Sequence, residues 1–439
     1  MRTEMSKLPP HDQELCTDVR SSTASIEDMN RQCFCVSVDL DAVHVELQKI
    51  LQPYGQVTDL RQSHPHLFAS LPVYVSRGHL ERIREVVVAI EEVVKSPAYQ
   101  SAVMAWAPQI ARFDPGSPGG LLGIDFHLSP EGPKLIEINT NPGGALLNTL
   151  LSQAQKVCAP DRMVPPTDPV QAEQQIFATL LAEWESQRGH LPLASVAIVD
   201  ETPRQQYLHP EFLLYCELLR KHGVRADIRA PEDVVIAGGR VFFAGESVDM
   251  VYNRMTDFAL QQPMNAALRE AYLERQIVLS PHPRAHALYA DKRNLSLIGD
   301  RSFLQSLGIS QTAVNALSTA VPTTTLLTPE NHEAMWVERR KLFFKPAAGF
   351  GSKASYRGDK LTRRIWSEIL RGTYVAQQIV PPSERSVAGQ DEPLKIDIRT
   401  FAYGGDILLY AARIYRGQTT NFRTFGGGFA PVLTDASTH

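Results

Sequence analysis

The sequence predicts a protein of the α/β class with α+β character. It combines antiparallel hairpins with a small parallel sheet. Two short alternating runs rich in β-formers, GIDFHL and PKLIEIN, flank the polar turn SPEGP within residues 123–139. Residues 394–417 repeat this pattern around a Tyr-Gly-Gly-Asp turn. Residues 195–230 instead hold an apolar strand, a helix and a strand, which is the β-α-β order of a parallel sheet.

Composition and helical spacing account for other segments. Residues 1–32 are polar and rich in turn formers, so we expect a loose tail. Residues 80–98 place apolar side chains at helical spacing, which predicts an amphipathic helix that packs near the first hairpin as scaffold. Residues 290–309 also predict a helix. A chain of 439 residues, of which 43% are hydrophobic, can bury two or three cores.

Three oxygen-bearing side chains are expected on one face of the first hairpin. If the turn centres near Glu131 and Gly132, Asp125 lies opposite Glu137, and Asn139 shares the face of Glu137 because side chains two apart point the same way. Two carboxylates and an amide carbonyl suit Mg²⁺, which prefers one or two carboxylates plus substrate phosphates. A surface hairpin with solvated acids is the alternative, although Glu and Asn are poor strand formers.

A strand that ends in a lysine leads into a glycine-containing loop in KLFFKPAAGFGSKASYRG, residues 341–358. Glycines let backbone N–H groups approach an oxyanion, and Lys345 at the strand end supplies positive charge at a fixed point. The loop is neither a Walker A motif nor a dinucleotide G-x-G-x-x-G, because Ala354 stands where the third glycine belongs. A solvated lysine beside an ordinary loop is the alternative.

These strings resemble the ATP-grasp superfamily, whose metal-binding end has a strand with Asp, a turn and an E-I-N-T-x-P-G strand. The resemblance implies that Asp125, Glu137 and Asn139 hold Mg²⁺, two ions in this family and replaceable by Mn²⁺, against the phosphates of ATP. It also implies a set of nucleotide-binding residues, namely Lys292, Lys345, Gly349, Gly351, Ser352, Lys353 and the hinge residues Gln377, Gln378 and Ile379. Arg399 and Arg413 would face the reacting phosphates as catalytic residues, unless they form a structural ion-pair network with nearby acids.

The strings stand in rotated order, with the metal-binding hairpin first and the nucleotide lobe last. This order resembles that of circularly permuted ATP-grasp proteins, such as eukaryotic-type glutathione synthetases and glutathionylspermidine synthetases. The strands of Glu137 and Arg399 should then share one sheet. The implied divisions are a tail (1–32), a helical region with the metal-binding hairpin (33–160), a small parallel-sheet substrate domain similar to the pre-ATP-grasp domain (161–285), a nucleotide-binding lobe (286–389) and the remaining strands of the other lobe (390–439).

The sequence gives less specific signals for the residues that would bind the acceptor substrate. Glutathione synthetases have a similar strand followed by Arg and Asp, so by position Arg254 and Asp257 would contact substrate. A solvated strand end is the alternative for this pair. Asn421, in a glycine-rich run, is a further candidate for substrate binding.

The resemblance implies an ATP-dependent carboxylate–amine ligase that forms an amide or peptide bond through an acyl phosphate and releases ADP and phosphate. Two alternatives stay open, an ATP-binding accessory protein without turnover and a phosphotransferase that stops at the phosphorylated substrate. The partners would be a small-molecule carboxylate and a small-molecule amine, neither of which the sequence names. Association into a homo-oligomer is left open.

Composition favours a cytoplasmic enzyme. A net charge of −4 and a pI near 6.4 give no reason to expect a nucleic-acid partner. The sequence has no apolar leader and no apolar run of roughly 18 residues, so we expect neither export nor a membrane span. The 5 cysteines are odd in number and scattered, which favours reduced thiols over a disulfide framework or a zinc site.

Overall fold

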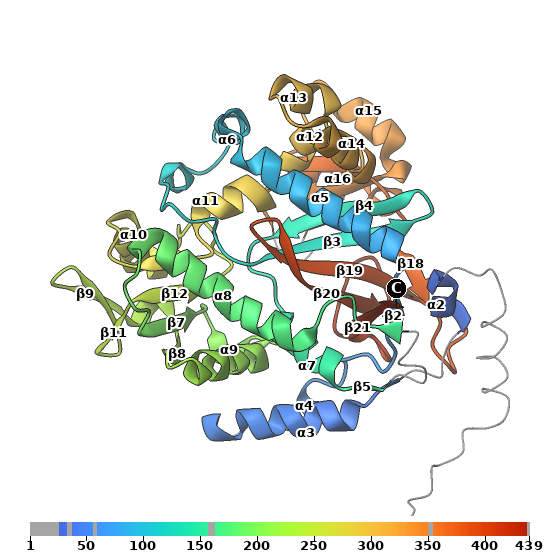
Figure 1. The fold of residues 1–439 in the computed structure, drawn as a ribbon. Helices are drawn as coiled ribbons and strands as arrows, with labels where there is room; N and C mark the ends of the chain where they lie inside the picture. Colours follow the sequence, from blue (N-terminus) through green and yellow to red (C-terminus); the bar gives the residue numbers. More distant parts are fainter. Residues whose placement is uncertain (1–25, 33–36, 56–58, 157–162, 350–353, 437–439) are drawn as a thin grey trace, which may run out of the picture.

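The computed structural model describes residues 26–32, 37–55, 59–156, 163–349 and 354–436, and one large sheet lies at its centre (Figure 1). Six strands cross it in the order β2, β21, β20, β19, β3 and β4, while β6 and β18 pair with β21 and β19. Their bounds are β2 Val73–Tyr74, β3 Leu122–Ser129, β4 Gly132–Asn139, β6 Met163–Val164, β18 Ser383–Arg385, β19 Leu394–Tyr403, β20 Asp406–Tyr415 and β21 Gly428–Asp435. Strands β2 and β21 run parallel, and the other neighbours are antiparallel.

The register of the sheet unites segments that are far apart in the sequence. Asp125 of β3 lies opposite Glu137 of β4 on one side and opposite Arg399 of β19 on the other. The prediction that the strands of Glu137 and Arg399 share one sheet is therefore confirmed, with β3 between them. A β-bulge directly after Asp125 shifts the pairing with β4.

Alternation along these strands gives the sheet two different faces. Ile124, Phe126 and Ile138 are buried in one core with α5 (Arg77–Lys95), the helix predicted over residues 80–98, and with α14 (Gln311–Ala320). The opposite face carries Phe401 and Ala411, which share a second core with α7 (Ala145–Gln153) and α8 (Pro169–Arg188). Asp125 and Glu137 alternate with the first set, so they belong to this second face.

The predicted small parallel sheet is present in residues 195–280. Its strand order is β13, β12, β7, β8, all parallel, and α9 (His209–Lys221) connects β7 to β8. A separate sheet of β9, β10 and β11 extends from its edge (Figure 1). The bounds are β7 Ser195–Val199, β8 Arg225–Arg229, β9 Val234–Ala237, β10 Arg240–Phe243, β11 Glu246–Val248, β12 Met250–Asn253 and β13 Val278–Ser280.

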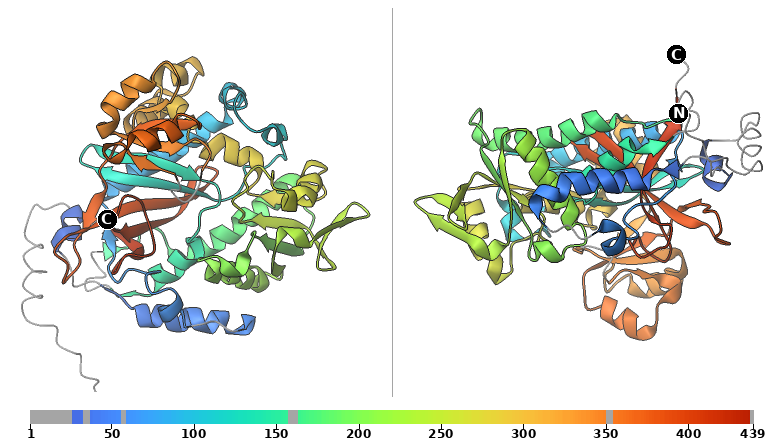
Figure 2. Two further views of the ribbon diagram at one scale, coloured as in Figure 1. Left: turned by 180° about the vertical axis from the view of Figure 1, so that it is seen from behind. Right: turned by 90° about the horizontal axis from the view of Figure 1, so that it is seen from below.

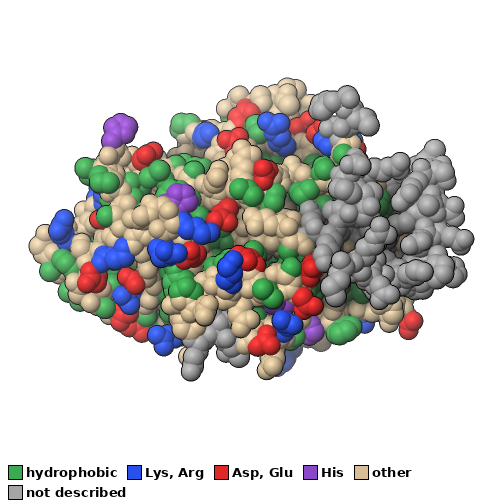
Figure 3. All heavy atoms as spheres, turned by 60° about the horizontal axis from the view of Figure 1, so that its bottom comes forward, with side chains coloured by type: hydrophobic (Ala, Val, Ile, Leu, Met, Phe, Trp, Pro, Cys, Tyr) green, Lys and Arg blue, Asp and Glu red, His purple; other side chains and the backbone are tan. Residues whose placement is uncertain are grey.

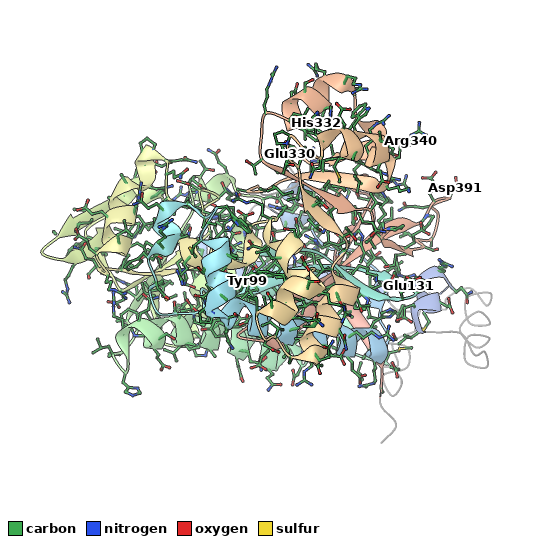
Figure 4. All side chains as sticks on the ribbon, turned by 90° about the horizontal axis from the view of Figure 1, so that it is seen from above. Tyr99, Glu131, Glu330, His332, Arg340 and Asp391 are labelled. Atoms are coloured by element: carbon green, nitrogen blue, oxygen red, sulfur yellow. The ribbon has the colours of Figure 1, made fainter. Side chains whose placement is uncertain are left out.

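A lobe built on a four-stranded sheet projects from the body, as the right-hand view of Figure 2 shows. Phe344, Trp366 and Ile369 form its core, and Figure 4 labels Glu330, His332 and Arg340 on its outer part. The strand order is β14, β17, β15, β16. The elements are β14 Thr324–Leu326, α15 His332–Glu338, β15 Leu342–Pro346, β16 Tyr356–Arg357, η9 Gly358–Lys360, α16 Arg363–Ile369 and β17 Tyr374–Gln378.

Two sequence-based expectations were wrong in part. Residues 26–32, assigned to a loose tail, form the helical segments η1 (Ile26–Asp28) and α2 (Met29–Gln32), because buried Asn30 exchanges two hydrogen bonds of 2.8 and 2.9 Å with the backbone of Tyr74. Residues 1–25 lie outside the described residues. The single helix expected over residues 290–309 is broken, since Asp300 starts a separate helix by accepting the Ser302 and Phe303 N–H groups. The two resulting helices are α12 (Asn294–Ile298) and α13 (Arg301–Ser306).

Two observations concern the surface and the helices. On the face drawn in Figure 3, Lys and Arg side chains stand among Asp and Glu side chains, and neither sign dominates the described part of that face. No helix within the described residues combines the length and the apolar character that crossing a membrane requires.

Candidate active site

Five of the predicted site residues lie together on the second face of the large sheet. Asp125, Glu137 and Asn139 come from the hairpin β3–β4, while Arg399 and Arg413 come from β19 and β20. The Asn139 amide nitrogen lies 3.3 Å from Asp125 Oδ2 and 3.4 Å from Glu137 Oε1. The structure therefore brings the predicted metal-binding trio together and sets two arginines beside it.

Asp125 is held by both arginines. Arg399 donates from Nε to Oδ1 at 2.7 Å and from Nη2 to Oδ2 at 2.6 Å, and Arg413 Nη2 donates to Oδ2 at 2.8 Å. The Asp125 side chain is only 2% exposed. Fork-like pairing of this kind is strong and directional, so Asp125 belongs to the ion-pair network that the sequence left open as an alternative.

Glu137 is the more accessible carboxylate of the cluster. Its side chain is 29% exposed, and Lys292 Nζ lies 4.0 Å from Oε2. Burial alone would raise the pKa of Glu137, but Lys292 and Lys345, together with the two arginines, hold that pKa below its ordinary value. Glu137 is therefore an ionised carboxylate that faces several positive charges.

Lys345 stands at the end of β15, as predicted, and is buried. Its Nζ donates to Gln377 Oε1 at 2.7 Å and to the Ile136 carbonyl at 3.0 Å, so it connects the small lobe to β4. Burial lowers the pKa of Lys345 to about 8, although Glu137 opposes the shift.

Lys292 approaches the cluster from the segment before α12. Its Nζ donates to the Gly349 carbonyl at 3.0 Å, and its backbone N–H donates to the Ala347 carbonyl at 2.9 Å. Lys292 thus contacts the start of the glycine-containing loop, which is where a lysine that binds phosphate is expected to lie. Gly351, Ser352 and Lys353 lie outside the described residues.

Asp397 is a second buried carboxylate of the site, and its four partners come from three segments, β3, β20 and the loop after β20. It accepts from His127 Nε2 at 2.9 Å, from the Tyr415 hydroxyl at 2.9 Å, from Arg413 at 3.2 Å and from the Thr420 hydroxyl. Burial raises the pKa of Asp397, but the bonds from His127 and Arg413 outweigh it and hold the pKa well below its usual range. The sequence pattern did not single out His127, although it follows Asp125 by two residues on the same strand.

A cavity of about 510 Å³ continues the site away from the hairpin. Lys395 and Tyr415 line it from β19 and β20, Glu384 from β18, and Arg357 and Lys360 from the small lobe. Lys395 precedes Asp397 by two residues and Arg399 by four, so alternation places all three on one face of β19. The cavity thus lies further along the same strand as the charged cluster, and we call the two together the elongated site.

Several polar groups of the predicted hinge residues already form hydrogen bonds within the small lobe. Gln377 is buried and its amide bridges Lys345 and the Thr324 hydroxyl. The backbone N–H groups of Gln378 and Ile379 donate to the carbonyls of Thr323 and Lys341. These N–H groups are therefore not free for a nucleotide edge, because the pairing continues to the residue before β14 on one side and to the residue before β15 on the other.

The three predicted substrate residues differ in their surroundings. Arg254 is buried at the end of β12, where Nη1 donates to the Pro142 carbonyl at 3.1 Å and to the Tyr252 hydroxyl at 3.2 Å. Its Nε has no hydrogen-bond partner among the described residues. A solvated strand end does not describe Arg254, since the side chain is buried close to the hairpin loop that follows Asn139.

Asp257 and Asn421 organise their own loops. One oxygen of Asp257 accepts from the Gln262 N–H and from the Asn265 amide, both at 2.7 Å. Asn421 donates to the carbonyls of Arg416 and Thr419 and accepts from the Arg423 N–H. Both side chains thus have structural partners, and their contact with substrate stays a prediction.

The cluster offers positive charge in excess of its carboxylates. Within the described residues, no group of three or more His, Cys, Asp or Glu side chains is placed to hold a metal ion. Four cationic side chains nevertheless surround three carboxylates, the cations being Lys292, Lys345, Arg399 and Arg413 and the acids Asp125, Glu137 and Asp397. A site of this kind can neutralise an anion with several charged oxygens.

Comparison with known proteins gives a likeness in fold and none in sequence. No protein-family model and no curated protein matches the sequence. Among solved structures, the glutathione synthetase-like effector GSS30 from Globodera pallida, in its apo form, has a TM-score of 0.51 at 10% identity, covering 88% of this chain and 96% of that one. A protein named as a gamma-glutamylcysteine synthetase from Methylobacillus flagellatus gives 0.46 at 12% identity, covering 81% and 87%. D-alanyl-alanine synthetase A from Vibrio cholerae gives 0.29 at 10% identity, covering 52% and 70%.

At these identities only the fold is informative, and only the first likeness carries weight. It spans nearly the whole of both chains. This likeness shows that the chain shares its fold with the glutathione synthetase-like effector.

Proposed function

We propose that this protein is an ATP-dependent carboxylate–amine ligase that forms an amide or peptide bond and releases ADP and phosphate. The observation that carries the proposal is the convergence of Lys292, Lys345, Arg399 and Arg413 around Glu137, where the small lobe meets the large sheet. Such a cluster favours a polyphosphate, because charge-assisted bonds to phosphate oxygens need donors that are already in place.

The nucleotide would lie along the elongated site. Its phosphates would reach the lysines and arginines at the hairpin end, and its nucleoside would enter the cavity beside Lys395 and Tyr415. The cavity volume of about 510 Å³ falls within the range of small-molecule sites, roughly 300–1,000 Å³. Gln378 and Ile379 would border the nucleoside through side chains and carbonyls, since their N–H groups are engaged in strand pairing, and Gln377 would act by holding Lys345 in place.

The chemistry follows from the charges of the protein groups. Lys345 and Arg399 would draw negative charge from the γ-phosphate as a substrate carboxylate attacks its phosphorus in line, which gives an acyl phosphate and ADP. An amine would then attack the acyl carbon and displace phosphate. Arg413 lies beside Arg399 across the Asp125 carboxylate, so either arginine could stabilise the oxyanion of this second step.

The donor set fits Mg²⁺ with one condition. Glu137 and Asn139 would hold the ion together with phosphate oxygens, after a 180° turn of the Asn139 amide that presents its oxygen. Asp125 would join through Oδ1, which accepts one hydrogen bond, and its charge would then be shared between the ion and the two arginines. The ion would supply charge neutralisation at the phosphates. A second Mg²⁺, replacement by Mn²⁺ and the circular permutation remain parts of the proposal.

On the acceptor side we propose that Arg254 contacts the carboxylate or acceptor substrate. It is buried with an unpartnered Nε in the described structure, and Arg399 Nη1 approaches the carbonyl of Gly143, the residue after Pro142, at 3.5 Å. Asp257 and Asn421 would act at the edge of this region. Cytoplasmic location and small-molecule partners are also part of the proposal, and association into a homo-oligomer is left open.

The test is release of ADP from Mg·ATP in the presence of amino-acid, γ-glutamyl and polyamine pools. ADP release that requires both a carboxylate and an amine supports the ligase. Release with the carboxylate alone would favour a phosphotransferase, and ATP binding without release in any pool would favour the non-catalytic accessory protein.

A further inference from the structure

His127 joins two parts of the elongated site that no other described residue links in the same way. Its Nδ1 lies 2.8 Å from the Val380 carbonyl, and its Nε2 lies 2.9 Å from Asp397 Oδ1. Val380 belongs to residues 379–382, the linker between β17 of the small lobe and β18 of the large sheet. Each ring nitrogen of His127 therefore has an oxygen partner within hydrogen-bond distance.

Asp397 connects this bridge to the phosphate end of the site. Arg413 donates to Asp397 at 3.2 Å and to Asp125 at 2.8 Å, and the Tyr415 hydroxyl, which belongs to the cavity lining, also donates to Asp397. The Thr420 hydroxyl completes the set from the loop after β20. A continuous path of hydrogen bonds thus runs from the linker through His127 and Asp397 to the arginine pair.

This path touches both the cavity lining and the arginine pair. The His127 side chain is 12% exposed and that of Asp397 is 8% exposed, and Asp397 contacts Tyr415 of the cavity lining as well as Arg413. The linker carries the chain directly from β17 of the small lobe to β18 of the large sheet. Its placement therefore sets where a nucleotide base bound beside the small lobe lies relative to the phosphates.

We propose that His127 is a positioning residue that fixes the linker carbonyl of Val380 relative to the Asp397–Arg413 pair, and thereby sets the span between the base end and the phosphate end of a bound nucleotide. The inference rests on the proposed nucleotide site. It predicts that His127 matters for a ligand that reaches both ends and not for one that occupies the phosphate end alone.

Two substitutions separate the two bonds. The amide nitrogen of Asn stands near the place of Nδ1, so His127→Asn keeps the bond to Val380 and loses that to Asp397. The amide nitrogen of Gln stands near the place of Nε2, so His127→Gln does the reverse. His79 offers a matched control, since its ring lies 2.8 Å from the Glu27 carboxylate and 3.2 Å from the Ser129 carbonyl, away from the cluster.

The measurement is calorimetric binding of Mg·ATP and of Mg·tripolyphosphate to the full chain, with thermal unfolding of each variant. We expect each His127 substitution to weaken Mg·ATP about tenfold, the effect of one hydrogen bond. Tripolyphosphate affinity should change by less than about twofold, and His79→Gln should alter neither ligand.

The outcomes separate this inference from the proposed function. If the His127 variants lose affinity equally for both ligands, or keep full affinity for Mg·ATP, His127 does not position the linker, while the nucleotide site stands. If the unaltered protein binds neither ligand, the nucleotide site itself is refuted and the role of His127 is refuted with it.

Discussion

Lys345 gives nucleotide binding a pH dependence whose direction follows from its pKa. The amine is buried between Gln377 and the Ile136 carbonyl, and burial lowers its pKa from 10.5 to about 8. A polyphosphate is attracted by the protonated amine and not by the neutral one. Affinity for Mg·ATP should therefore be full below pH 8 and should decline as the pH rises through that value.

The size of the effect follows from the protonated fraction. With a pKa of about 8, roughly 90% of Lys345 is protonated at pH 7 and roughly 10% at pH 9, so the apparent affinity should fall about tenfold over this interval. Binding above pH 8 should also take up a proton. The substitution Lys345→Arg removes the dependence, because a guanidinium stays charged throughout the range.

Calorimetry at several pH values, in buffers with different ionisation enthalpies, measures both the affinity and the proton uptake. An affinity that stays within about twofold between pH 7 and pH 9 would refute the reasoning, as would an equal decline in Lys345→Arg. The stability of the ligand-free protein gives a second, independent measurement. Since the folded-state pKa is depressed, the contribution of Lys345 to the free energy of unfolding should rise between about pH 8 and pH 10.5, and Lys345→Met should abolish this slope.

The remaining predictions concern catalysis and the fold. Glu137→Gln should lower ADP release by about 10² or more. It should also lower the free energy of unfolding of the ligand-free protein by about 1 kcal/mol, because the ionised carboxylate faces several cations. Unchanged activity would remove Glu137 from the site. Gly144→Ala should cost about 2–4 kcal/mol in thermal unfolding, because Gly144 has φ +98° and an added Cβ would lie 2.3 Å from the Phe429 ring. Gly223→Ala is its control, because Gly223 has φ +75° and open space around it, and this substitution should cost only about 1 kcal/mol; equal losses would show that contact with Phe429 is irrelevant.

Local patterns predicted the hairpin and the register of its two strands. Period-two alternation around a Pro- and Gly-containing turn defines both strands, and their register places Asp125 opposite Glu137, as observed. The family resemblance then supplied the long-range step, that a strand bearing Arg399, 274 positions after Asp125, lies in the same sheet. No alternation pattern contains that information, because it specifies which face a residue occupies and not which strand lies beside it.

Side-chain partners were less accessible to prediction. The sequence allowed Asp125 to be a metal ligand or part of an ion-pair network, and the choice depends on two arginines whose approach is decided by tertiary packing. The same reason hides the bridge made by His127, since Val380 and Asp397 become its neighbours only when the linker folds over β3. The break before α13 was visible in principle, because Gly299-Asp300 is a stop signal followed by an N-cap.

The charges of the site explain why its ligand-free state is ready for an anion. Asp125 and Asp397 are ion-paired with Arg399 and Arg413, so they offset the charge of Lys345 less than Glu137 does. Glu137 alone faces both lysines, and it does not prevent the depression of the pKa of Lys345. Unbalanced positive charge in a buried place costs stability without ligand. A polyphosphate removes that cost when it binds, and its oxygens meet donors whose orientation the sheet has already fixed, which is the condition under which electrostatic groups favour transfer of a phosphoryl group.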